Sequence, residues 1–165
     1  MGRIGALAAP IFMSTSGKAH LTGIYRHYLD DKNRVTIPSA WRNLFEQEST
    51  FLAIPNPDGY VTVLPPAEAD KLHDKFAGMP LSDTEGQDVL TAFMASTQSF
   101  KFDKQGRIGL SDSLFSHVGL SGPKEEVVLV GSATKFNIYS PARWSVIEAK
   151  STPATVASVL KRFAI

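Results

Sequence analysis

The segment Leu29–Pro38 reads LDDKNRVTIP, and the segment Phe102–Ser111, 73 residues further along the chain, reads FDKQGRIGLS. The two segments align without a gap. They share an aspartate, an arginine four positions later and apolar residues at alternate positions after that arginine. A second match, at a spacing of 75 residues, links VTVLPPA at Val61–Ala67 with FNIYSPA at Phe136–Ala142. Similarity at a nearly constant spacing indicates an internal repeat. We therefore expect two copies of one structural unit.

Each copy is expected to form a β-hairpin, a short amphipathic helix and two further strands. Alternating apolar residues flank each turn, and apolar residues at helical spacing follow it. Pro66 and Pro141 stand where a proline favours the start of a helix. The expected strands are 25–29, 34–37, 51–54, 60–64, 99–102, 107–110, 127–130 and 135–139, and the longer helices are 67–76, 82–95, 142–149 and 153–163. The fold class is therefore α+β, with two tandem ββαββ units and appended helices.

The two units are expected to share one core. A single unit of about 45 residues buries too little apolar surface to be stable alone. Two units related by a pseudo-two-fold axis can exchange hairpins and enclose a common, β-barrel-like core. The expected division is residues 22–97 for the first repeat with its helices and residues 98–165 for the second repeat with a C-terminal helix. Residues 1–21 are expected to be a disordered N-terminal extension.

Four residues are expected to shape the two turns. Asp30 and Asp103 open the turns, where a carboxylate can accept backbone N–H groups. Asn33 and Gly106 occupy equivalent positions, and these two residue types best tolerate a left-handed backbone. The coincidence indicates that both turns have the same geometry.

The arginine that follows each turn is the main candidate for ligand binding. Alternation along the strand directs Arg34 and Arg107 to the face opposite the apolar residues. The fork of donors in a guanidinium group fits a guanine edge or a phosphate. The alternative is that each arginine forms an ion pair with Asp30 or Asp103 and clips the turn. The two roles are compatible.

Other cations lie near the turns in the sequence. Lys32 and Lys104 are candidates for phosphate contacts, with plain solvated lysines as the alternative. Arg26 and Lys101 are candidates for extending the basic face. Five cations and two anions lie between residues 18 and 42, whereas six acids and two lysines lie between residues 65 and 90. A basic binding face separate from an acidic one is compatible with this distribution, although scattered surface charge explains it too.

Composition argues against several other classes of protein. The net charge is +1, and the chain has no cysteine and four histidines. No two histidines have the spacing of common zinc motifs, so neither a metal nor a cofactor is expected. The sequence Ser16-Gly17-Lys18 lacks the other residues of a P-loop, and no enzymatic site or small-molecule substrate is expected. The apolar run in residues 4–13 is short and interrupted, so neither a signal peptide nor a membrane helix is expected.

Four segments together resemble the MraZ family of the SpoVT/AbrB swapped-hairpin superfamily, and the likeness extends from about Thr22 to Ala149. These segments are GIYRHYLD at 23–30, KNRVTIP at 32–38, DKQGRI at 103–108 and VVLVG at 127–131. The resemblance implies a cytoplasmic, nucleoid-associated regulator of transcription of the division and cell-wall gene cluster. It also implies a ring-shaped homo-oligomer that binds short direct repeats in double-stranded DNA upstream of its own operon. Arg34 and Arg107 would contact the DNA, assisted by Lys32 and Lys104.

The chain departs from the family pattern at several positions. Asn33 stands where glycine is usual, Ser111 stands where the first copy has Pro38, and Gln105 stands where the first copy has Lys32. Gln105 predicts that the two copies contribute unequally to DNA binding. The alternative function is an AbrB-like antitoxin or protein-interaction module whose hairpins bind a partner protein.

Overall fold

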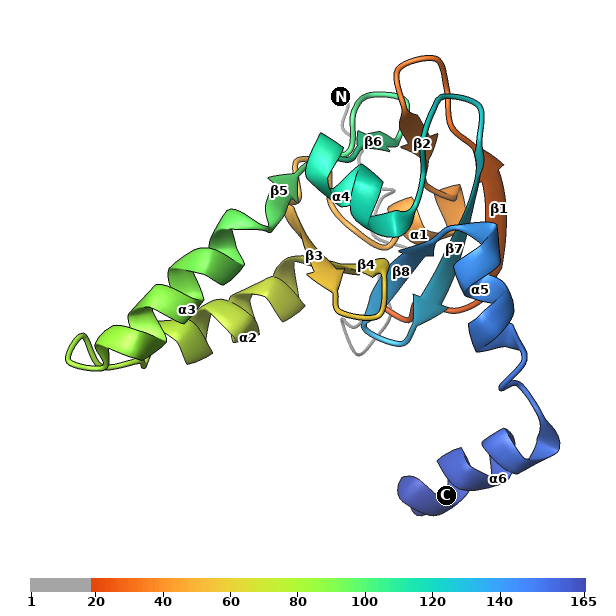
Figure 1. Ribbon diagram of the computed structural model, residues 1–165. Helices are drawn as coiled ribbons and strands as arrows, with labels where there is room; N and C mark the ends of the chain where they lie inside the picture. Colours follow the sequence, from red (N-terminus) through yellow and green to blue (C-terminus); the bar gives the residue numbers. More distant parts are fainter. Residues whose placement is uncertain (1–18) are drawn as a thin grey trace, which may run out of the picture.

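The computed structural model describes residues 19–165 and has an α+β fold, as predicted (Figure 1). The strands are β1 Ile24–Tyr28, β2 Arg34–Thr36, β3 Phe51–Asn56, β4 Tyr60–Leu64, β5 Gln98–Phe100, β6 Arg107–Gly109, β7 Glu126–Ser132 and β8 Lys135–Tyr139. The helices are α1 Ser39–Arg42, α2 Pro66–Ala77, α3 Thr84–Ala95, α4 Asp112–Val118, α5 Pro141–Glu148 and α6 Pro153–Arg162. All the elements expected from the sequence are present, with boundaries shifted by a few residues at most.

The strands form an open six-stranded antiparallel sheet and a separate two-stranded ribbon. The sheet has the order β1-β7-β8-β4-β3-β5, and the ribbon pairs β2 with β6. Within residues 19–165 no ladder joins the edge strands β1 and β5, so hydrogen bonding does not close the expected barrel. The ribbon packs Val35 and Ile108 into the same core as the sheet. Burial of the ribbon's apolar face thus completes the core without strand closure.

The two repeats are interleaved, and the hairpin predicted within each repeat is wrong in its pairing. Each turn is closed by a backbone hydrogen bond, from Asp30 to Arg34 and from Asp103 to Arg107. Beyond the turns, β1 pairs with β7 and β5 pairs with β3, while β2 and β6 pair with each other. The two strands beside each turn separate because each of them pairs with a strand from elsewhere in the chain. Within residues 19–165, four ladders, β1–β7, β2–β6, β3–β5 and β4–β8, join one half of the chain to the other.

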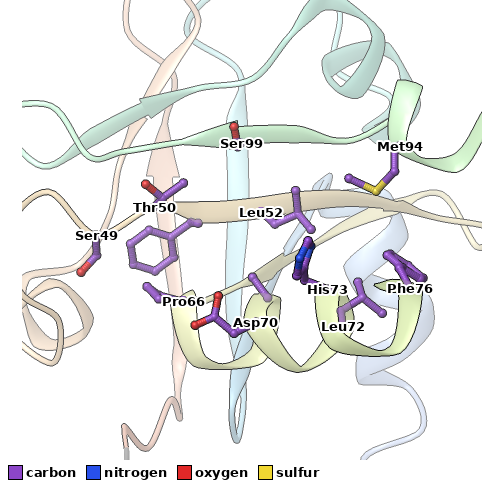
Figure 2. Close-up of a pocket in the computed structure, with 12 residues that line it drawn as sticks. Ser49, Thr50, Leu52, Pro66, Asp70, Leu72, His73, Phe76, Met94 and Ser99 are labelled. Carbon is purple, nitrogen blue, oxygen red and sulfur yellow. The ribbon is translucent and has the colours of Figure 1, made fainter. Parts of the chain in front are cut away.

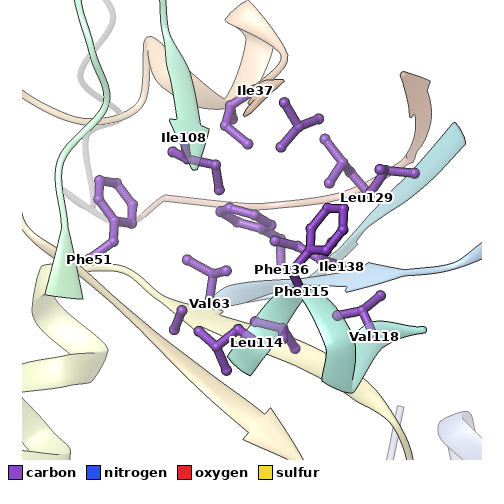
Figure 3. Close-up of a cluster of buried hydrophobic side chains, with 14 of the residues drawn as sticks. Ile37, Phe51, Val63, Ile108, Leu114, Phe115, Val118, Leu129, Phe136 and Ile138 are labelled. Atoms are coloured by element: carbon purple, nitrogen blue, oxygen red, sulfur yellow. The ribbon is translucent and has the colours of Figure 1, made fainter. Parts of the chain in front are cut away.

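One hydrophobic cluster contains side chains from both repeats (Figure 3). Trp41 of the first repeat and Phe136 of the second lie with their ring centroids 5.0 Å apart. The largest fully buried side chains are Phe51, Phe136, Leu21, Ile37, Leu114, Leu129, Ile138, Val35, Val61, Val63, Val127 and Val128. Neither half therefore encloses its apolar side chains by itself.

The folded part of the chain includes Leu21, which the sequence had assigned to a disordered extension. Leu21 is fully buried, and its backbone exchanges two hydrogen bonds with Ala133. Gly131 allows this close approach, because a Cβ atom there would lie 2.5 Å from the backbone of Leu21 and Thr22. The rest of the expected extension, residues 1–18, lies outside the described residues.

The helices differ in how much they contribute to the core. The short helix α4 is capped by Ser111, whose Oγ accepts the N–H of Leu114, and it buries three of its side chains. In contrast, α2, α3 and α6 have no buried residue. Figure 1 shows α2 and α3 projecting from the sheet on one side and α6 projecting on another. Among residues 19–165, no helix has the length and apolar character that crossing a membrane requires.

Candidate nucleic-acid interface

The first turn is held by Asp30. Its Oδ1 accepts the backbone N–H groups of Lys32 at 2.8 Å and Arg34 at 2.9 Å. Asn33 has a positive φ of 58°, the left-handed conformation that asparagine tolerates better than most residues. The turn therefore presents Lys32 at its tip and directs Arg34 into β2.

The second turn repeats this geometry around Asp103. Its Oδ1 accepts the N–H groups of Gln105 at 2.9 Å and Arg107 at 2.8 Å. Gly106 has a φ of 76°, and a Cβ atom at this position would lie 2.4 Å from the side chain of Arg42. The left-handed backbone thus favours glycine here, and a side chain at this position would have to displace that of Arg42. The contact also places Arg42, which the sequence did not single out, beside the second turn.

Pairing of β2 with β6 places both turn arginines on one face of the ribbon. Val35 faces Ile108 in the register, and both side chains are buried. Arg34 is opposite Gly109 and Arg107 is opposite Thr36, so these residues share the other face. Figure 1 shows the ribbon and the turns at one end of the molecule.

Each arginine forms an ion pair with the aspartate of its own turn. Arg34 Nε lies 2.8 Å from Asp30 Oδ2, and Arg107 Nε lies 2.8 Å from Asp103 Oδ2. A longer contact of 3.7 Å joins Arg107 Nη1 to Asp30 Oδ2, which links the two turns. The arginine side chains are 31% and 26% exposed, respectively. The ion pair that the sequence left as an alternative is therefore present, and it orients a guanidinium group that solvent still reaches.

The free donors of the two arginines differ. Arg107 Nη2 donates a hydrogen bond of 3.1 Å to the side-chain oxygen of Gln105. Among residues 19–165, neither Nη1 nor Nη2 of Arg34 makes a hydrogen bond. Arg34 thus has more unused donors than Arg107.

The turn carboxylates are held in their charged form. The N–H group of Arg34 is the largest contribution to a pKa of Asp30 below its ordinary value of 3.8. Partial burial acts to raise the pKa of Asp103. Hydrogen bonds from Arg107 and Gln105 outweigh this effect, so the pKa is again lowered. Both ion pairs are therefore intact at neutral pH.

The remaining turn cations are lysines. Lys32 and Lys104 are exposed, and neither forms an ion pair with another residue of the described chain. Lys124 donates its backbone N–H to Leu29, and its Nζ lies 3.8 Å from Asp31 beside the first turn. Lys124 lies in a loop nearly 100 residues after the first turn in the sequence. No local sequence pattern therefore indicated that it lies beside this turn.

Arg26 and Lys101, the candidates for extending the basic face, each form an ion pair. Arg26, on the edge strand β1, pairs with Glu126 at 3.1 Å. Lys101 pairs with Glu48 at 3.1 Å. Each of these cations is therefore balanced by an acid that is distant in sequence, whereas Lys32 and Lys104 are not.

Comparison with known proteins places the chain among bacterial regulators. The MraZ family model, whose description calls the family antitoxin-like, matches residues 93–162. A protein of Halothermothrix orenii named "Transcriptional regulator MraZ" is 31% identical over 122 residues, which cover 74% of this chain and 82% of the relative. Proteins of the same name from Spiroplasma kunkelii and Lactobacillus delbrueckii subsp. bulgaricus are 32% identical over 126 residues and 33% identical over 123 residues. These alignments cover 76% and 74% of this chain, and 85% and 82% of the relatives, respectively. The chain belongs to the MraZ family of transcriptional regulators.

Proposed function

We propose that this chain regulates transcription by binding double-stranded DNA through the two turns at the end of the β2–β6 ribbon. The observation that carries the proposal is the placement of Arg34 and Arg107 on one half-exposed face of the ribbon, each oriented by a carboxylate through Nε. An arginine held in this way keeps its Nη groups for hydrogen bonds, and it loses little conformational entropy on binding. Bidentate contacts of arginine with guanine are the commonest specific contacts in the major groove.

The two aspartates are positioning residues in this mechanism. Asp30 and Asp103 neutralise much of the arginine charge, so non-specific attraction to phosphates falls mainly to Lys32 and Lys104, with Arg42 and Lys124 nearby. Contacts with phosphates set the register, and contacts with bases supply the specificity. The proposed division of labour is therefore base contact by Arg34 and Arg107 and phosphate contact by the lysines.

Two arginines in one chain make a small interface, so we propose that several chains act together. A ring-shaped homo-oligomer that meets short direct repeats multiplies weak contacts through effective concentration. The proposed target is the region upstream of the chain's own operon, in the division and cell-wall gene cluster. The proposed location is the cytoplasm, in association with the nucleoid. The interleaved repeats are proposed to be the swapped-hairpin arrangement of the SpoVT/AbrB superfamily.

The test is a gel-shift titration of this upstream region at several salt concentrations. Arg34→Ala is expected to weaken specific binding by about 1 to 3 kcal/mol, because a base contact is lost. Lys32→Ala is expected to weaken binding to all sequences alike and to reduce the salt dependence. Lys75→Ala, which removes an exposed lysine of α2, is the control. A chain that does not retard DNA even at low ionic strength would refute the proposal. So would full binding by Arg34→Ala.

A second candidate is an antitoxin or protein-interaction module, which the description of the family model favours. In that case the turns would bind a partner protein, and retardation of DNA would not depend on Arg34. Thermal unfolding of Arg34→Ala tests a third possibility, in which Arg34 only stabilises the turn. In that case the variant has a lower melting temperature, but its affinity for DNA is unchanged at a temperature where it is folded.

A further inference from the structure

Helix α6 has an apolar face that no other part of residues 19–165 covers. Val156, Val159, Leu160 and Phe163 are exposed and follow the i, i+3, i+4, i+7 spacing of one helix face. A helix of ten residues is marginal in water unless it packs against something. The apolar face of α6 therefore indicates a docking partner.

The hairpin of α2 and α3 offers an apolar groove. The groove has a volume of ≈ 650 Å³, and the apolar side chains that line it are Leu72, Phe76, Met79, Val89, Leu90 and Phe93. A second cavity of ≈ 400 Å³ lies between α2 and β3 (Figure 2). Leu72 and Phe76 line both cavities, so the two hollows adjoin along α2. Although these side chains are apolar, neither helix has a fully buried residue.

The charges around the groove and on α6 are complementary. Asp83 and Glu85 lie at the groove. In contrast, residues 150–165 contain no acidic side chain, and Lys161 and Arg162 occupy the last turn of α6. An apolar face bordered by cations thus matches an apolar groove bordered by acids.

The arrangement of the helices directs this match to a second copy of the chain. Figure 1 shows the α2–α3 hairpin and α6 leaving the core on different sides. The link between α5 and α6 spans only residues 149–152, so it holds the start of α6 within about 18 Å of the end of α5. We propose that α6 of one copy packs into the α2–α3 groove of the next copy. Such a head-to-tail contact uses two different surfaces, and its repetition generates a ring when the rotation closes.

The inference rests on the homo-oligomer of the proposed function but not on DNA binding. The test follows the mass of the full chain by sedimentation velocity over a range of concentrations. Leu160→Asp places a charge in the apolar face of α6, and Val89→Asp places one in the groove. The two side chains are 43% and 64% exposed in one chain, so the fold should be unaffected. Each variant is expected to raise the apparent dissociation constant of the oligomer at least about tenfold. Leu81→Asp, 86% exposed and outside the groove lining, is the control expected to assemble normally.

A mixture of the two variants provides a sharper test. Leu160→Asp keeps an intact groove and Val89→Asp keeps an intact helix, so together they are expected to form a one-to-one heterodimer that grows no further. Circular dichroism checks that both variants are folded. A wild-type chain that stays monomeric at all concentrations would overturn the inference, as would normal assembly of Leu160→Asp. Arg34→Ala is expected to assemble like the wild type. If the wild type assembles through α6 and the groove but does not bind DNA, the docking inference stands and the proposed function fails.

Discussion

At the scale of single residues, the two turns have the same hydrogen bonds around the aspartate, but their arginines differ in how many Nη donors are unused. Asp30 and Asp103 make matching hydrogen bonds to the backbone and to the arginine. Gln105 then accepts a hydrogen bond from Arg107, whereas its counterpart Lys32 carries a charge and cannot accept one. One substitution between the repeats therefore changes a charge and also occupies a guanidinium donor.

This difference predicts unequal contributions to DNA binding. Arg107→Ala is expected to weaken specific binding less than Arg34→Ala, because Arg107 has fewer free donors. Gln105→Ala is expected to strengthen binding by up to about 1 kcal/mol, because it frees Nη2 of Arg107. Fluorescence anisotropy with labelled operator DNA measures both effects, and Gln47→Ala, an exposed glutamine outside the turns, is the control. Weaker binding by Gln105→Ala would show that Gln105 itself contacts DNA.

At the scale of elements, each turn is a short loop stabilised by one carboxylate. Strands β2 and β6 have three residues each, so they contribute few ladder hydrogen bonds. Asp30 and Asp103 supplement these with hydrogen bonds to backbone N–H groups and arginine side chains. The stability of the ribbon is therefore linked to ionisation of these two groups.

The linkage predicts a loss of stability in acid. Both carboxylates have a pKa lowered from 3.8, so the folded state binds protons less readily than the unfolded state. Their stabilising effect is complete above the unfolded pKa of 3.8 and is lost as the pH falls through the lower folded pKa. In the double variant Asp30→Asn with Asp103→Asn, the melting temperature should fall less steeply with pH in this range. Asp88→Asn, an exposed substitution on α3, should leave the slope unchanged. An identical slope in the double variant would contradict the prediction.

At the scale of the whole molecule, the two repeats depend on each other. Ladders between the halves involve all eight strands of the described residues, and one hydrophobic cluster contains side chains of both halves. Trp41 packs against Phe136 and against Tyr25, with ring centroids 5.0 Å and 5.1 Å apart. The halves should therefore unfold together.

Phe136→Ala tests this cooperativity. The change is expected to cost about 3 to 5 kcal/mol, because it removes a fully buried aromatic ring from the common core. In a Trp144→Phe background, the fluorescence of Trp41 and the far-UV circular dichroism should report one transition with the same midpoint. The exposed substitution Val146→Ala should change stability by no more than about 0.5 kcal/mol. If Trp41 of Phe136→Ala unfolded at the wild-type midpoint, the repeats would be independent.

The sequence by itself determined the repeat, the turns and the order of the elements. These features depend on local patterns: the spacing of apolar residues, the left-handed conformation at Asn33 and Gly106, and the aspartate that opens each turn. Such patterns act within a few residues, so they can be read without the rest of the chain. The resemblance to the MraZ family came from the same segments.

The tertiary structure alone decided which strands pair and which cations remain free. The turn predicted a hairpin, but β1 pairs with β7, about 100 residues away, and β2 pairs with β6. The same long separations join Arg26 to Glu126 and bring Lys124 to the first turn. Periodicity shows which face of a strand is buried, but it carries no information about the partner. That choice depends on how both halves bury their apolar side chains at once, which is a property of the whole chain.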